Sequence, residues 1–473
     1  MINYSDWLHQ KRAPHPLPDD NFYAGLLEQL SPHPDADDLI LLRQADVLGV
    51  KTASHPLLPS RIPAHLDDGQ AELLDRLTAS PWKSGDHIAL ATWLDELQPA
   101  LDHLVATASR ADSYRPLISE TSEFILSFGF PEISAARLSA KLLGARAMRS
   151  LANGQAAIAR NDLLAIHRMG HHLGQANSMI ELLIAYAVDS IAYHSSAIWM
   201  THKSVTSDDR EEFLSTLAGL KPFHRMADTV VGAEQACGLD CLQRIFASDP
   251  KIAATARKSF LEPSLFSELS NSWIPTRRVV FEIMRWRANF DELRKDLEDR
   301  YRHLSQLCTA TASSYRSESL TKYLDGISPF QTWSEELLFV GKLCFTSTAR
   351  RNQLLCDFFF SEFVVTLPMA LSAEVRHGAY SSLILLLKEA VDHREKTGNW
   401  PTAIEELPSA QLLQSKIDRG TYSVSNTPEK FIVTLEGWNG AEEAPASGVE
   451  ETPEEQEIRL RINRVTLEVP ALS

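Results

Sequence analysis

Cysteine is scarce in this chain, with 5 residues in 473 and no CxxC pair. A small, odd and irregularly spaced set of cysteines argues against a disulfide framework. Glycine and proline, at 20 and 24 residues, are too few for a fibrous or collagen-like protein. Apolar residues make up 44% of the chain, so it can bury a substantial core and is not wholly disordered.

Basic residues are fewer than acidic ones, 46 against 62, which gives a formal net charge of −16. This charge repels nucleic-acid phosphates and anionic membrane surfaces, so we expect neither as a partner. Long apolar runs are also missing. The best candidate, residues 179–200, contains Glu181, Asp189 and His194.

Each charge at the centre of a bilayer costs ~2.5–3.5 kcal/mol. That segment therefore predicts a buried helix and no membrane insertion. The first 20 residues contain no apolar stretch of the kind that signal peptides carry. We therefore expect a soluble, cytoplasmic protein.

Three common active-site motifs are absent: GxSxG, GxGxxG and GxxxxGK[ST]. Their absence removes the most direct evidence for a hydrolase, a dinucleotide-binding enzyme or a nucleotide-binding enzyme. An enzyme whose site is spread over distant parts of the chain remains open.

Hydrophobic periodicity predicts a mainly α-helical body over residues 66–397. We expect antiparallel helical hairpins that are repeat-like and stack into a curved, superhelical body. A proline-rich arm, residues 1–65, precedes the body and holds short helices at 22–30 and 38–48. A small α+β module, residues 398–473, follows it.

The clearest hairpin joins helices at residues 134–151 and 155–173. Gly154 lies in the short link, where a helix C-cap favours glycine. Such a short link makes the two helices antiparallel. A helix from Ile88 to Val105, with a kink at Pro99, is expected before this hairpin.

The C-terminal module alternates strand and turn signals. Residues 421–425 and 431–436 predict two paired strands. Residues 440–457, rich in Glu, Ala, Pro and Gly, predict a flexible acidic loop. Residues 458–462 alternate apolar and basic side chains and predict a third strand, which residues 465–469 continue.

Two histidines form the strongest candidate metal site. His167 and His171 are four residues apart, which places both rings on one face of a helix. Imidazoles at that spacing can bind zinc or another transition metal. The candidate ligands are His167, His171, Glu181 and His194. Two further acidic residues, Asp162 and Asp189, are close to them in the sequence.

The alternative explanation of the same residues is a polar shoulder on a packed helix. The acidic residue of HExxH is absent here, and Arg168 would oppose a bound cation. On this interpretation the chain holds no cofactor.

Four patches occur in order within residues 80–440; they are 81–102, 114–117, 145–169 and 393–407. Together they resemble a family of uncharacterised, mostly helical proteins of planctomycete bacteria. The last patch is also similar to the segment that follows the long helix of pseudopilin-like secretion proteins. The resemblance implies a helical fold and transfers no catalytic residues. Members of the family carry a calcium-loop-like segment, which the Glu-rich residues 450–457 replace here.

The third patch also resembles a tetratricopeptide hairpin. A solenoid of that kind repeats every 34 residues, and we find no second clear copy. The sequence therefore predicts a TPR-like hairpin and not a repeat array.

Three functions are consistent with these features. We favour a non-enzymatic scaffold or protein-interaction protein with a protein partner, since a long helical body offers extended surfaces. The alternative is a helix-bundle enzyme or sensor with a transition metal at His167 and His171. A third is a soluble relative of secretion or envelope machinery. The oligomeric state does not follow from the sequence.

Overall fold

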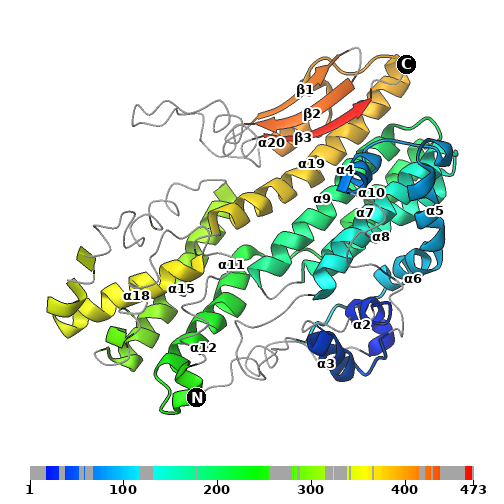
Figure 1. Ribbon diagram of the computed structural model, residues 1–473. Helices are drawn as coiled ribbons and strands as arrows, with labels where there is room; N and C mark the ends of the chain where they lie inside the picture. Colours follow the sequence, from blue (N-terminus) through cyan, green and yellow to red (C-terminus); the bar gives the residue numbers. More distant parts are fainter. Residues whose placement is uncertain are drawn as a thin grey trace.

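The computed structural model shows long helices arranged side by side, with a small sheet at one end (Figure 1). It describes residues 17–30, 38–52, 58, 68–116, 131–175, 178–254, 280, 282–284, 288–314, 323, 338–339, 342–364, 367–414, 421–427, 430–436 and 464–470. The predicted fold class, mainly helical with a small C-terminal α+β module, is confirmed. In this described part, no helix has the length and apolarity that a bilayer span demands.

Three consecutive helices form the centre of the molecule. They are α7 (Pro131–Ala152), α8 (Ala156–Leu173) and α9 (Met179–Thr201). Gly154 has a φ of 74° in the turn after α7, a conformation that costs glycine little. α9 begins with a capping box, in which Ser178 Oγ and a Glu181 carboxylate oxygen each accept from the other residue's backbone N–H. The predicted hairpin and the third helix are therefore present, with ends that differ by a few residues.

Shorter helices precede this centre. They are η1 (Pro18–Asp20), α2 (Phe22–Leu27), α3 (Asp38–Leu48), α4 (Asp68–Leu77), η2 (Ser84–Asp86), α5 (Ile88–Glu96) and α6 (Gln98–Ala108). The kinked helix predicted from Ile88 to Val105 is in fact two helices. The helix is interrupted at Leu97, which is both the C-cap of α5 and the N-cap of α6. Pro99 lies in the first turn of α6, where the missing backbone N–H is tolerated. α2 is buried and packs on α6 in the same core as α7–α9.

The second half of the chain builds another core. Its elements are α10 (Ser207–Ala218), α11 (Met226–Thr229), the π-helical turn η4 (Val230–Glu234), α12 (Gln235–Ile245), α15 (Phe290–Ser314), α18 (Thr348–Val364) and α19 (Leu367–Thr397). Buried side chains of α11, α12, α15, α18 and the first part of α19 form this second core. α9 contributes its first residues to it and its remaining residues to the first core. α19 is divided between the two cores in the same way.

The C-terminal module packs against the far half of α19. It comprises η5 (Ile404–Glu406), α20 (Ala410–Gln414), β1 (Thr421–Asn426), β2 (Lys430–Glu436) and β3 (Arg464–Pro470), with the strands antiparallel in the order β1-β2-β3. The strands predicted at 421–425 and 431–436 correspond to β1 and β2, and β3 contains residues 465–469. The predicted loop at 440–457 and the strand at 458–462 lie outside the described residues. β3 packs on both α9 and α19, and Trp400 stacks on Phe431 with ring centroids 4.4 Å apart.

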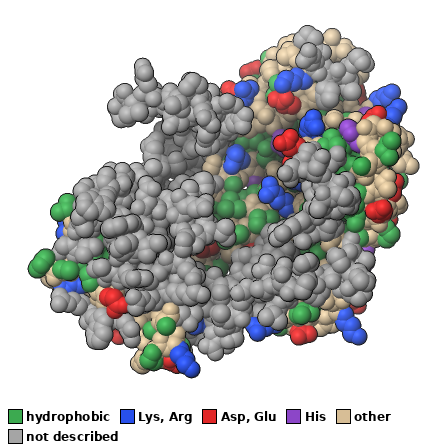
Figure 2. Space-filling model, viewed as in Figure 1, with side chains coloured by type: hydrophobic (Ala, Val, Ile, Leu, Met, Phe, Trp, Pro, Cys, Tyr) green, Lys and Arg blue, Asp and Glu red, His purple; other side chains and the backbone are tan. Residues whose placement is uncertain are grey.

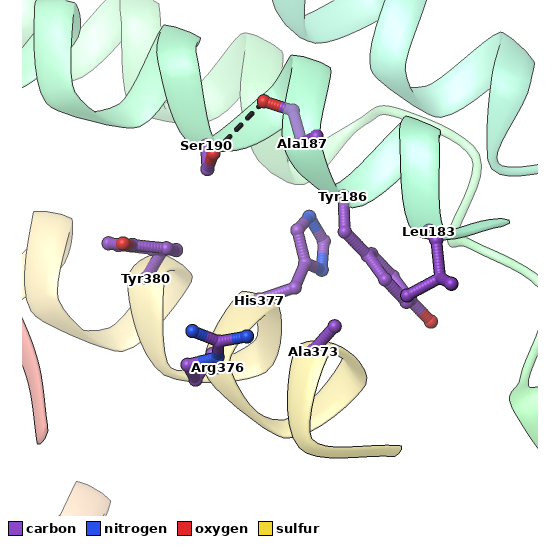
Figure 3. A pocket seen from close by; sticks show the side chains of 8 residues that line it. All are labelled: Leu183, Tyr186, Ala187, Ser190, Ala373, Arg376, His377 and Tyr380. Carbon is purple, nitrogen blue, oxygen red and sulfur yellow. Dashed lines mark hydrogen bonds between the residues drawn. The ribbon is translucent and has the colours of Figure 1, made fainter. Parts of the chain in front are cut away.

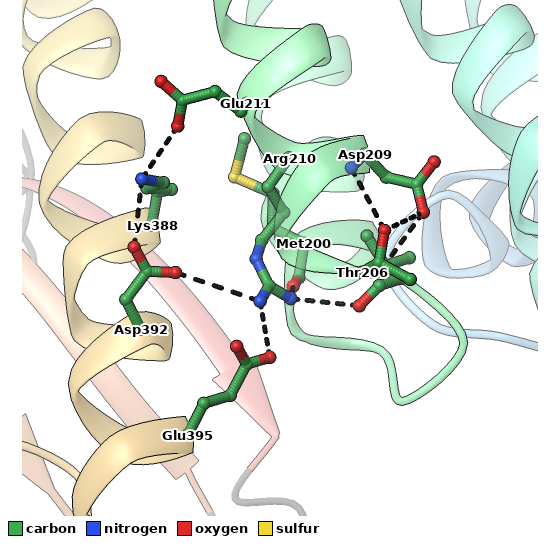
Figure 4. A network of polar contacts seen from close by, with 9 residues as sticks. Met200, Thr206, Asp209, Arg210, Glu211, Lys388, Asp392 and Glu395 are labelled. Atoms are coloured by element: carbon green, nitrogen blue, oxygen red, sulfur yellow. Dashed lines mark hydrogen bonds and ion pairs between the residues drawn. The ribbon is translucent and has the colours of Figure 1, made fainter.

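A polar cluster fixes α10 to the end of α19 (Figure 4). The Arg210 side chain is 1% exposed and donates hydrogen bonds to two preceding backbone carbonyls and to Glu395 of α19. Lys388 of α19 pairs with Glu211 of α10 at 2.9 Å. These carbonyl and carboxylate partners compensate part of the desolvation of the buried guanidinium, whose Nε has no hydrogen-bond partner among the described residues.

Candidate functional site

His167 and His171 lie one turn apart on α8, as predicted, but their rings make different contacts. His167 is fully buried and hydrogen-bonds to Asp189 of α9. His171 Nδ1 donates to the carbonyl oxygen of Lys221 at 2.6 Å, and burial lowers the His171 pKa. The two imidazoles therefore do not point at a common ligand position.

Glu181 and His194, the other two predicted ligands, are engaged elsewhere. Glu181 Oε1 accepts a hydrogen bond from Arg115 Nη1 at 3.1 Å, with both side chains almost completely buried. His194 Nε2 lies 3.1 Å from the Tyr380 hydroxyl. The two predicted ligands on α9 are separated by roughly 20 Å of helix, which is too far for one metal ion. The structure thus does not bring the predicted ligands together, and the residues that it describes contain no group of three His, Cys, Asp or Glu able to hold a metal ion.

Asp162, another predicted acidic group, forms an ion pair within the first core. Arg146 Nε and Nη2 donate to its two carboxylate oxygens at 3.0 and 2.6 Å. Burial raises the pKa of Asp162 to about 6, although Arg146 acts in the opposite direction. This bidentate pair joins α7 to α8.

A buried carboxylate connects three helices at the centre of the molecule. Asp189 of α9 accepts hydrogen bonds from His167 Nδ1 of α8 and from His377 Nε2 of α19, both at 2.6 Å. The other nitrogen of His167 lies 3.2 Å from Ser196 Oγ. The side chains of Asp189 and His167 are 0% exposed, whereas that of His377 is 14% exposed. The chain of contacts therefore runs from the core outwards to His377.

The charge of Asp189 depends on these partners. Burial acts to raise its pKa, but the charges and hydrogen bonds of His167 and His377 outweigh burial and hold the pKa well below its ordinary value. Asp189 is therefore an anion, and each imidazole presents an N–H to it. A carboxylate in this position fixes the orientation of both rings.

Gly170 allows α8 to approach α9 closely enough for this contact. A Cβ atom at Gly170 would lie 2.9 Å from the Cβ of Asp189 and 3.3 Å from its backbone. Distances that short are sterically excluded, so a larger residue would push the helices apart. The glycine that interrupts the histidine cluster in the sequence thus has a packing role.

A pocket of about 310 Å³ lies where α9 passes α19, next to His377 (Figure 3). Each helix contributes four residues at i, i+3, i+4 and i+7, which is one helical face. The lining residues are Leu183, Tyr186, Ala187 and Ser190 of α9, and Ala373, Arg376, His377 and Tyr380 of α19. Small side chains, among them Ala187 and Ala373, leave a space between the two helices. Tyr186 and Tyr380 flank this space. Figure 2 shows a hollow near the middle of the face viewed in Figure 1, with hydrophobic and basic side chains inside it.

The polar wall of the pocket is formed by two consecutive residues of α19. The ring of His377 is held from behind by Asp189, and its Nδ1 makes no hydrogen bond with any described residue. Arg376 makes no ion pair in the described part of the chain, and its buried Nε has no hydrogen-bond partner. Figure 3 shows the guanidinium group beside His377 and Tyr380, whereas the Tyr186 hydroxyl points away from it.

Sequence reasoning identified half of this site. Asp189 was recognised on the helix that follows the histidine cluster, and His167 was a predicted ligand. His377 and Arg376 were missed, because they occur 188 residues from Asp189 in a long helix without a motif around them. The available signal was an adjacent Arg and His on the helical face that also carries Ala373 and Tyr380.

Comparison of the chain with known protein families, with curated proteins and with solved structures gives no match. The resemblance to planctomycete and pseudopilin-like proteins therefore stays a prediction.

Proposed function

We propose that this protein binds a small organic molecule in the pocket between α9 and α19. The observation that carries the proposal is the cavity of about 310 Å³, which combines apolar walls with two adjacent polar side chains. Pockets for small molecules typically measure ~300–1,000 Å³ and are apolar with a few placed polar groups. The cavity thus has the size and the mixed lining of a ligand site.

The rigidity of the polar wall supports the same function. His377 is hydrogen-bonded to a completely buried carboxylate, which in turn is bonded to a completely buried histidine. Binding groups held on helices by packed neighbours lose little freedom when a ligand arrives. We therefore expect the pocket to bind without a large rearrangement.

Saturation-transfer NMR with four one-ring compounds tests the proposal: benzoate, benzamide, benzyl alcohol and benzylamine. We expect at least one of them to bind the unmodified protein. The variant Ala187→Leu should abolish that binding, because the larger side chain fills the space. Ala157→Leu, on an exposed position of α8, is the matched control and should bind as the unmodified protein does.

The proposal is contradicted if none of the four compounds binds. It is equally contradicted if Ala187→Leu binds as well as the control variant, since the compounds would then occupy another part of the surface.

The scaffold function and the protein partner expected from the sequence stay predictions, as do the cytoplasmic location and a role near secretion machinery. Native mass spectrometry of the purified chain, before and after a chelator, addresses both the oligomeric state and the metal hypothesis. A mass loss of about one metal ion that His171→Ala abolishes would support the metal hypothesis. A mass that the chelator leaves unchanged would contradict it.

A further inference from the structure

We infer that the ligand of this pocket is an organic anion with a compact apolar body, held through Arg376. The inference rests on the binding function proposed above and adds the charge and the shape of the ligand. Its basis is that Arg376, in a protein whose net charge is −16, has no counter-ion among the residues that the structure describes.

Arg376 lines the cavity, and its guanidinium group has neither an ion-pair partner nor an acceptor for its buried Nε among the described residues. A guanidinium is always charged and presents planar, forked donors that match an oxyanion. An anion in the cavity would supply the missing acceptor, and this is the chemistry that the arrangement favours.

Other arginines of the chain show the contrast. Arg146 pairs with Asp162 and Arg115 with Glu181, both through buried contacts. Arg210 is almost completely buried, and Glu395 accepts a hydrogen bond from it. These three buried arginines each have a carboxylate partner, whereas Arg376, which lines the pocket, forms no ion pair in the described part of the chain.

The acidic groups around the pocket do not neutralise Arg376. Glu374, two residues earlier on α19, lies on a different side of the helix, and its Oε1 accepts from the backbone N–H of Met226 at 3.3 Å. Asp189 is an anion, but both of its oxygens accept from imidazoles and it does not line the cavity. Among the described residues that line the cavity, Arg376 therefore carries a positive charge that no carboxylate pairs with.

The remaining walls set the size and character of the rest of the ligand. Leu183, Ala187 and Ala373 are apolar, and the ring of Tyr186 lies against His377 at a centroid distance of 5.0 Å. A cavity of about 310 Å³ has the liquid volume of roughly ten water molecules, which suits a single ring with a short acidic group. We therefore expect a small carboxylate or phosphate ester with an aromatic or aliphatic body.

Isothermal titration calorimetry with matched probes tests the inference. Benzoate and benzamide have nearly the same shape and differ in charge, and phenyl phosphate replaces the carboxylate by a phosphate. We expect benzoate or phenyl phosphate to bind at least tenfold more tightly than benzamide. The stronger of the two anions then identifies the acidic group that the site prefers.

The variant Arg376→Gln should weaken binding of the preferred anion at least tenfold and leave benzamide within about twofold. Arg376→Lys, which keeps the charge but loses the fork, should retain a part of the affinity. Lys396→Gln, at an exposed position of the same helix, removes the same charge and should change nothing. Unfolding curves of all three variants show whether each is folded.

Equal affinity for benzoate and benzamide would overturn the inference and leave the binding function standing. Unchanged anion binding by folded Arg376→Gln would do the same. Failure of every probe to bind would instead contradict the binding function on which the inference rests.

Discussion

Asp189 places one negative charge where three helices meet, and its surroundings stabilise that charge through two imidazoles. Removing a partner from a buried charged pair typically costs 3–5 kcal/mol, because the other partner stays buried without compensation. The same carboxylate also fixes the ring of His377 at the wall of the pocket. Asp189 therefore contributes both to stability and to the geometry of the pocket wall.

We expect Asp189→Asn to lower the free energy of unfolding by about 3–5 kcal/mol, measured by urea denaturation at pH 7. Because the folded-state pKa of Asp189 lies below its unfolded value, the stabilisation is present above the unfolded pKa and is lost as the pH falls through the folded pKa. The variant should therefore lose less stability in acid than the unmodified protein. Asp95→Asn, whose exposed carboxylate pairs with Arg149, is the control and should cost at most ~1 kcal/mol.

The pKa of Glu234 is shifted in the opposite direction from that of Asp189. It is half-buried at the end of the π-helical turn, and its Oε1 accepts from the backbone N–H of Met179 at 2.8 Å. Burial raises its pKa to about 7, the Met179 hydrogen bond acts against burial, and Glu181 adds to the rise. A carboxyl with a raised folded pKa stabilises the fold at low pH, and this contribution disappears as the pH rises through about 7.

Glu234→Gln should remove this pH dependence while keeping the acceptor for Met179. We expect the variant and the unmodified protein to be equally stable near pH 4.5, and the variant to be more stable at pH 8 by roughly 2 kcal/mol. Thermal unfolding between these pH values is the measurement, and Glu96→Gln, at an exposed position of α5, is the control. A variant that loses stability at every pH would show that the contact with Met179 requires the carboxyl group itself, whether ionised or not.

At the scale of elements, the contact between α8 and α9 depends on the absence of a side chain at position 170. Gly170→Ala would place a Cβ 2.9 Å from Asp189, so we expect a loss of about 1–3 kcal/mol. Gly378→Ala, on α19, meets nothing within 4 Å and should instead gain about 0.5–1 kcal/mol. Urea denaturation of the two variants gives this difference in sign, and equal effects would refute the packing role of Gly170.

The elements that the sequence predicted well are those with local signals. The α7–α8 hairpin and α9 have an apolar period, a glycine turn and a capping box, so their ends were placed within a few residues. The break at Leu97 was missed because a proline is compatible with both a kink and a new helix start. The pocket could not be predicted, since the apposition of α9 and α19 depends on tertiary packing between segments far apart in the chain.

At the scale of the whole molecule, the small sheet shares a core with the helices. Trp400, Phe431 and Val469 belong to the same buried cluster as α7–α9. Elements that share one core unfold together, so the sheet should not melt as a separate unit. The predicted boundary at residue 398 thus marks a change of secondary structure within a continuous core.

Trp400→Ala tests this cooperativity, because the ring is 7% exposed and stacks on Phe431. We expect a loss of about 3–5 kcal/mol in the opening free energy of α8 amides, measured by hydrogen exchange. Leu412→Ala, at a side chain that is 60% exposed, should change it by at most ~0.5 kcal/mol. Unchanged α8 protection in folded Trp400→Ala would show that the sheet opens independently.

α19 runs through both cores as one helix of 31 residues, about 46 Å long. Its first half carries the pocket wall, and its second half carries the residues that meet α10 and the sheet. Because α19 is packed into both cores along its length, the pocket wall and the Glu395 contact belong to one rigid element. The packing that anchors the sheet at one end of α19 therefore also restrains the position of Arg376 and His377 at the pocket.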